Sequence, residues 1–147
     1  MSFDWREYAQ IAADLADLGS RLTASAEARQ RAAISRAYYA GFCVARNWLA
    51  GIATDLEVIN QKRAHSTNLH RTVPRKFIGS KNAALVHVGS ALLRMRVARN
   101  FADYDDVLPA GVTSEDLADD ALADVTLVLN VLDVSTKSEF CLGRVVS

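Results

Sequence analysis

Arg99 occupies the position in this chain that is most informative about chemistry. Four apolar residues before it recur at the spacing of one helix face: Leu85, Val88, Leu92 and Met95. The same alternation places Arg99 next on that face, where a charged side chain needs an ionic partner, an interface or a cleft. Asp103 follows at the spacing of a helical ion pair, so one interpretation is structural. The other is that the guanidinium faces a groove and holds a phosphate through its bidentate fork. The sequence leaves both open.

A second polar set lies on the helix that the sequence predicts over residues 26–52. Its members share one side of that helix, beside the main apolar stripe: Arg36, Tyr39, Cys43 and Arg46. Two arginines with an aromatic ring between them suit a surface that binds the phosphates and bases of RNA. Long arginine side chains also extend from a buried helix to water for purely structural reasons. The sequence alone favours this second interpretation.

Charged residues are divided unevenly along the chain, although the formal net charge is zero. Residues 61–100 contain nine Lys and Arg, among them Arg94 and Arg96, together with all three His and no Asp or Glu. Residues 101–147 contain ten Asp and Glu against two Lys and Arg. The basic stretch predicts an anion-binding surface, unless the acidic C-terminal helix lies over it and neutralises it. The sequence does not decide between these two arrangements.

Motifs of the common enzyme classes are missing from the sequence. There is no Gly-rich phosphate loop, no H-E-x-x-H and no G-x-S-x-G, and His65, His70 and His87 form no i, i+4 pair. We therefore expect neither a metal site nor a cofactor.

Cys43 and Cys141 form no C-x-x-C pair, which predicts reduced thiols in a cytosolic protein. The chain starts without signal-peptide features and has no run of about 18 apolar residues, so we expect a cytoplasmic protein without a membrane span.

Helical periodicity dominates the rest of the chain. It predicts main helices over residues 4–23, 26–52, 80–103 and 113–135, with Thr113 as the N-cap of the last, and a shorter piece over 66–78. Pro74 is expected in the first turn of the short piece or at a break in it. Residues 53–66 are expected to form a surface connection and residues 137–147 an irregular tail. We predict a single all-α domain over residues 1–147, an antiparallel bundle of four main helices plus one short helix.

Three segments of the chain match, in order, the motifs of a known helical family. Ser35–Arg46 reads S-R-A-Y-Y-A-G-F-C-V-A-R, His65 and Ser66 follow, and Arg99–Asp105 reads R-N-F-A-D-Y-D. The first segment resembles the S-R-x-Y-Y-A-x-F-x-x-A-R signature of HEPN domains (higher eukaryotes and prokaryotes nucleotide-binding). The second resembles the His-Ser or His-Gly of their small stand-alone branch, and the third resembles that branch's R-x-x-A-D-Y-D element. This branch is often encoded beside minimal nucleotidyltransferases.

The resemblance implies a HEPN-like bundle of four to five helices, usually a homodimer with its interface near the Arg-bearing helix. Many members are metal-independent RNases of toxin–antitoxin or defence systems, with an Arg followed after four to six residues by a His. In them the His serves as general acid and base for attack by the ribose 2′-hydroxyl, while the Arg stabilises the transition state. Here the His positions after Arg99 hold Tyr104, Asp105 and Asp106, which are poor substitutes at neutral pH. Arg63 and His70 have the spacing but lie outside the expected helix, so we treat that match as coincidence.

This departure leaves three hypotheses. The first is a dimeric HEPN-like module that binds a nucleotidyltransferase partner or RNA without strong catalysis of its own. The second is a metal-independent endoribonuclease toxin whose diverged site combines Arg99, Asp103, Tyr104 and His65 across the dimer interface. The third is a scaffold whose charge asymmetry serves self-assembly. The candidate RNA- or anion-binding residues are Arg36, Arg46, His65, Arg94 and Arg96.

Overall fold

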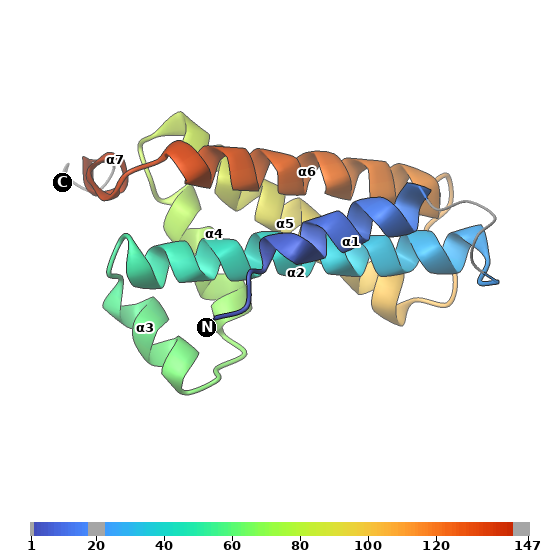
Figure 1. Ribbon diagram of the computed structural model, residues 1–147, viewed down its shortest axis with the longest axis horizontal. Coiled ribbons are helices and arrows are strands. Elements are labelled where there is room, and N and C mark those ends of the chain that lie inside the picture. The colour runs from blue at the N-terminus through green and yellow to red at the C-terminus, as the bar shows by residue number, and fades with distance from the viewer. Residues whose placement is uncertain (1, 18–22, 143–147) are drawn as a thin grey trace.

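The computed structural model describes residues 2–17 and 23–142, and these residues form helices without a strand, as predicted for an all-α protein. The helices are α1 (Arg6–Asp17), α2 (Ala26–Gly51), α3 (Leu56–Arg63), α4 (Leu69–Ile78), α5 (Ala83–Tyr104), α6 (Ser114–Val134) and α7 (Lys137–Leu142) (Figure 1). Along the described ranges, none of these helices combines the length and apolar character needed to cross a bilayer.

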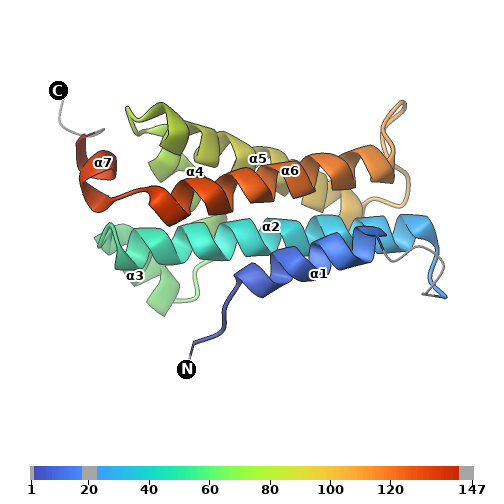
Figure 2. The same cartoon turned by 45° about the horizontal axis from the view of Figure 1, so that its top comes forward.

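Helix α2 lies at the centre of the molecule. It packs against α1, α5 and α6, and the two views show α1, α2 and α6 running side by side along the long axis (Figures 1 and 2). Most of its residues between positions 33 and 49 are buried, because apolar side chains occupy nearly every face of this part of the helix. The central place predicted for this helix is confirmed. The side chains of this buried part of α2 therefore face several other elements.

The apolar face around Arg99 is buried within the chain itself. Leu85, Val88, Leu92 and Met95 are almost fully covered and belong to one core with residues of α2, α4 and α6. The spacing argument for this face is thus confirmed. A dimer contact is not what covers it, so the interface explanation for Arg99 is wrong. The neighbouring helices of the same chain exclude water from the face.

Several boundaries differ from the sequence-based expectation. The segment expected as a connection contains α3, which buries only Val58 and is too short to show a periodic pattern. Its N-terminus is capped by Asp55, whose carboxylate accepts a hydrogen bond from the Val58 N–H at 3.2 Å. Helix α1 begins at Arg6, two residues later than predicted, and the expected part over residues 18–22 lies outside the described residues. The tail, expected to be irregular, begins with α7. Thr113 is the N-cap of α6, as predicted.

Pro74 lies inside α4, beyond its first turn, so the expectation for this residue is wrong. Helix α4 crosses α5 very closely at Gly89, where an added Cβ would lie 2.8 Å from the carbonyl oxygen of Pro74 and 2.9 Å from the nitrogen of Ile78. Only a residue without a side chain fits this crossing. The close contact fixes α4, and with it His70, against the Arg-bearing helix α5.

Candidate functional site

Arg99 lies near the C-terminal end of α5 and is only 8% exposed. Its Nη1 donates a hydrogen bond to the Tyr104 hydroxyl at 3.2 Å. The guanidinium carbon lies 5.1 Å from the ring centre of Tyr38, 5.7 Å from that of Tyr39 and 5.6 Å from that of Tyr104. Three aromatic rings within about 6 Å attract the charge, because the face of each ring is electronegative. Within the described part of the chain, the buried Nε has no hydrogen-bond partner.

The ion pair predicted between Arg99 and Asp103 is present, but it is long. Nη1 of Arg99 lies 3.9 Å from Oδ2 of Asp103. The same carboxylate oxygen accepts a hydrogen bond of 3.2 Å from the Ser35 hydroxyl on α2. The structure therefore brings together Arg99, Asp103 and Tyr104, the three candidate catalytic residues. Tyr104 is itself 71% exposed, so this cluster reaches the surface through the tyrosine.

His70 is not among the residues that the sequence singles out for the site, but like Arg99 it contacts Tyr38. Its Nδ1 and the Tyr38 hydroxyl share a hydrogen bond of 2.6 Å. Its ring stacks on Phe42 with centroids 4.4 Å apart. Burial, followed by the positive charges of Arg99, Arg96 and Arg46, lowers the pKa of His70 below its ordinary value. The imidazole is thus neutral at pH 7.

Tyr38 connects His70 with Arg99. Its ring packs under the guanidinium of Arg99, while its hydroxyl bonds to His70. Burial raises the pKa of Tyr38 far above its ordinary value, so the phenol keeps its proton at every physiological pH. Within the described residues the hydrogen bonds of His70 leave Nε2 without a partner. The cluster therefore offers one neutral imidazole nitrogen, held in place by a protonated tyrosine.

A pocket of about 480 Å³ adjoins His70 between α2, the corner joining α3 to α4, and the start of the chain. We call it the basic pocket; its lining residues are Trp5, Tyr39, Phe42, Cys43, Arg46, Lys62, His65, Ser66, Leu69 and His70. The lining contains cationic and aromatic side chains but no carboxylate. Burial raises the pKa of the Cys43 thiol, which is consequently unreactive at neutral pH. The pocket suits a ligand that carries both negative charge and a planar ring.

Two of the predicted anion-binding residues meet in this pocket. Arg46 lies over the Trp5 ring, 5.8 Å from its centre, and its Nε donates to Oδ1 of Asn47 at 3.1 Å. His65 has a φ of 51°, a left-handed conformation that costs a residue with a side chain about 1 kcal/mol or more. This turn directs the chain from α3 into α4 and places His65 at the pocket.

Arg36 and Arg96 lie close to the pocket without lining it. The Arg36 guanidinium is 4.8 Å from the ring centre of Tyr8 and 5.8 Å from that of Tyr39. Nη1 of Arg96 donates to the main-chain carbonyl of His70 at 3.3 Å. Both arginines add positive charge around the tyrosines and His70, so four of the five predicted anion-binding residues gather in one region.

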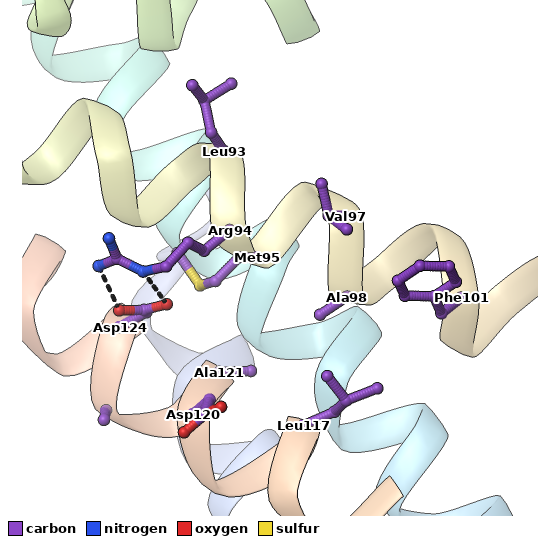
Figure 3. Close-up of a pocket in the computed structure, with 11 residues that line it drawn as sticks. Leu93, Arg94, Met95, Val97, Ala98, Phe101, Leu117, Asp120, Ala121 and Asp124 are labelled. Atoms are coloured by element: carbon purple, nitrogen blue, oxygen red, sulfur yellow. Dashed lines mark hydrogen bonds and ion pairs between the residues drawn. The ribbon is translucent and has the colours of Figure 1, made fainter. Parts of the chain in front are cut away.

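Arg94, the fifth, lies elsewhere. It forms a two-point ion pair with Asp124 on α6, with distances of 2.8 and 3.2 Å, at the end of a groove between α5 and α6 (Figure 3). Among the ion pairs of the described residues, this is the one that joins α6 to the basic stretch. Lys76 is instead paired with Asp55 and Glu57. The acidic helix thus neutralises one residue of the stretch and leaves the basic pocket uncovered.

No local pattern in the sequence indicates His70 as a site residue, because its partner Tyr38 belongs to a different helix. The one usable clue is Pro74, four residues later, which cannot donate to the His70 carbonyl in a helix. Nowhere in the described ranges do three His, Cys, Asp or Glu side chains come together as a metal site would require. No family model, curated protein or solved structure matches this chain.

Proposed function

We propose that this chain is a HEPN-like helical module of a two-component system, of toxin–antitoxin or defence type, and that it binds RNA without strong catalysis of its own. The basic pocket is the single observation that carries RNA binding. It collects Arg46, Lys62, His65 and His70 around aromatic rings, with no carboxylate in its lining. Single-stranded nucleic acid binds such surfaces through phosphate contacts and base stacking.

The setting of Arg99 supports weak catalysis. An arginine that stabilises a phosphorane needs its donors aimed at the phosphate. The Arg99 guanidinium is instead enclosed by three tyrosine rings and a carboxylate, and it is 8% exposed. The three positions where family RNases have a His hold Tyr104, Asp105 and Asp106. This combination favours a structural role for Arg99.

Fluorescence anisotropy with a labelled single-stranded RNA of about a dozen nucleotides tests the proposal. Replacing Arg46 and Lys62 together by Gln should weaken binding by roughly tenfold or more, because two phosphate contacts are lost. Lys81→Gln is the matched control, since Lys81 is exposed and lies beyond the opposite end of α4. Affinity should also fall steeply between about 50 and 200 mM salt. Salt-independent binding, or a double variant that binds like the control, contradicts the proposal.

A metal-independent endoribonuclease is the second candidate, and the Tyr38–His70 hydrogen bond favours it. In that reaction neutral His70 accepts the proton of a ribose 2′-hydroxyl as its oxygen attacks the adjacent phosphorus. The 5′ oxygen then leaves and takes a proton from water. Cleavage of total RNA in the presence of a chelator, lost in His70→Gln, would establish this function in place of the first.

Two remaining parts of the proposal, a nucleotidyltransferase partner and a homodimer, rest on the family resemblance, and the proposed cytoplasmic location rests on the cysteine pattern and the start of the sequence. The buried face of Arg99 cannot provide the dimer interface, so a homodimer must use another surface. Light scattering tests the assembly directly. A particle of 16.0 kDa, the mass of one chain, at tens of micromolar contradicts the homodimer.

A further inference from the structure

An apolar groove of about 640 Å³ runs between α5 and α6, on a surface separate from the basic pocket. Its lining includes the buried residues Met95, Ala98 and Ala121 and four larger apolar side chains that are less buried, Leu93, Val97 and Phe101 from α5 and Leu117 from α6 (Figure 3). Leu93 is 40% exposed and Val97 is 54% exposed. Apolar side chains that share an exposed groove are typical of protein-interaction sites.

The α6 side of the groove carries a row of carboxylates. Asp120 and Asp124 line the groove, and Asp116 lies one turn before Asp120 on the same side of the helix, just beyond the lining. Asp124 is neutralised by Arg94. Asp116 and Asp120 are exposed, and the ion pairs of the described residues do not include them. Helix α6 contains no Lys or Arg that could compensate this charge.

We propose that this groove binds an amphipathic helix of a partner protein, with apolar residues along one face and Lys or Arg beside them. Apolar side chains at spacings of three and four residues would enter the groove between Val97 and Leu117. Basic residues one turn apart would face Asp116 and Asp120, which are also one turn apart. The occupant is thus defined by two features, the apolar lining of the groove and the carboxylates of α6. This inference does not depend on RNA binding.

A second copy of this chain fits the groove poorly. The lining contains one cation, Arg94, which is paired with Asp124 and whose charge is also attracted by Asp120. Two copies paired groove to groove would leave Asp116 and Asp120 of each facing apolar residues or other carboxylates. Burying carboxylates without a cation is unfavourable. A cationic partner removes this cost.

Two synthetic helical peptides of about 15 residues test the proposal on the full chain. Both carry Leu at the same helical spacing, and one has Lys where the other has Glu. The Lys peptide should bind at least roughly tenfold more tightly at about 50 mM salt, and the difference should shrink at about 500 mM. Val97→Glu should reduce binding of the Lys peptide by a similar factor. Val134→Glu is the matched control, because Val134 is 77% exposed near the other end of α6.

Three results would overturn the inference. The first is equal or undetectable binding of the two peptides. The second is a Val97→Glu protein that binds the Lys peptide as well as the Val134→Glu protein does. The third is a dimer in light scattering that Val97→Glu dissociates and Val134→Glu does not, since a second copy would then occupy the groove. Circular dichroism melting curves establish that both variants are folded, as expected for substitutions at exposed positions.

Discussion

Arg96 donates a hydrogen bond to the main-chain carbonyl of His70, an acceptor that the helix itself leaves without a donor. In a regular helix the N–H of the residue four positions later would serve this carbonyl, but that residue is Pro74. The guanidinium on α5 therefore replaces a missing helical hydrogen bond on α4. This contact holds the backbone of His70 beside Tyr38 and helps to explain how a proline is tolerated inside the short helix.

The first prediction concerns this replacement. Arg96→Met keeps most of the side-chain length and removes the donor, so it should lower the free energy of unfolding by about 1–2 kcal/mol. In a Pro74→Ala background the new N–H can bond the His70 carbonyl, and the same substitution should cost less than half as much. Urea denaturation of the four proteins gives this coupling as a double-mutant cycle. Equal costs in the two backgrounds would show that the Arg96 contact contributes nothing through this carbonyl.

The fold was predictable where periodic patterns are long. The periodic apolar residues before Arg99 predicted α5, and the N-cap residue Thr113 predicted the start of α6. Both patterns lie within a single segment of the chain. Helix α3 was missed because eight residues with one buried side chain show no period. Pro74 was misplaced because its compensation comes from Arg96, a residue of another helix. Patterns within one segment do not show such tertiary compensation.

The candidate site was predictable only in part, for the same reason. Arg99, Asp103 and Tyr104 occupy adjacent turns of one helix, so their spacing was enough to place them together. The contact between Tyr38 and His70 joins residues that are 32 positions apart, and nothing local indicates it. The packing of Tyr38 and Tyr39 of α2 around Arg99 could not be predicted from the sequence for the same reason.

The second prediction is a pH dependence of stability through His70. Its pKa is lowered from 6.5 in the native state, so the unfolded chain binds more protons as the pH falls below that ordinary value. The free energy of unfolding should therefore decrease as the pH is lowered from about 7.5 to 5, because the native state disfavours the protonated form of His70. The hydrogen bond with Lys76 lowers the pKa of Glu57 below its ordinary value, which already lies below this pH range. Glu57 therefore stays ionised while His70 is titrated.

Urea denaturation at the two pH values checks this prediction. His70→Gln should have a flatter pH dependence than the parent protein, because it removes the group that resists protonation. His87→Gln is the control, since His87 is exposed on α5. A His70→Gln protein with the same pH dependence as the parent would show that protonation of His70 is not linked to folding.

The third prediction concerns the crossing of α4 and α5. Gly89→Ala places a methyl group 2.6 Å from Cγ1 of Ile78 and 2.8 Å from the carbonyl oxygen of Pro74. Because backbone atoms cannot move aside as a flexible side chain can, we expect a loss of about 1–3 kcal/mol in stability. Gly51→Ala has nothing within 4 Å of its added Cβ and should be neutral or stabilising by up to about 1 kcal/mol. Thermal melting of both variants measures the difference, and similar melting temperatures would contradict the close approach.

The last prediction is that the purified chain cleaves RNA weakly or not at all in the presence of a chelator. General acid–base catalysis is worth about 10²–10⁴ in rate, and the family's His is missing after Arg99. Incubation with total RNA and with transfer RNA, followed by gel analysis, measures this activity. Arg99→Ala should mainly destabilise the fold, by about 1–3 kcal/mol, because it leaves the tyrosine rings around a cavity and removes the ionic partner of Asp103.

Arg99→Lys separates structure from catalysis, because it keeps the charge and loses the planar guanidinium with its bidentate fork. If Arg99 is structural, the Lys variant should bind RNA like the parent protein and melt at a slightly lower temperature. If the parent protein cleaves RNA strongly and the folded Arg99→Lys protein does not, the prediction of weak activity is wrong. Arg99 would then have a catalytic role. Strong cleavage that survives Arg99→Lys but not His70→Gln would instead make the neutral imidazole beside Tyr38 the catalytic base.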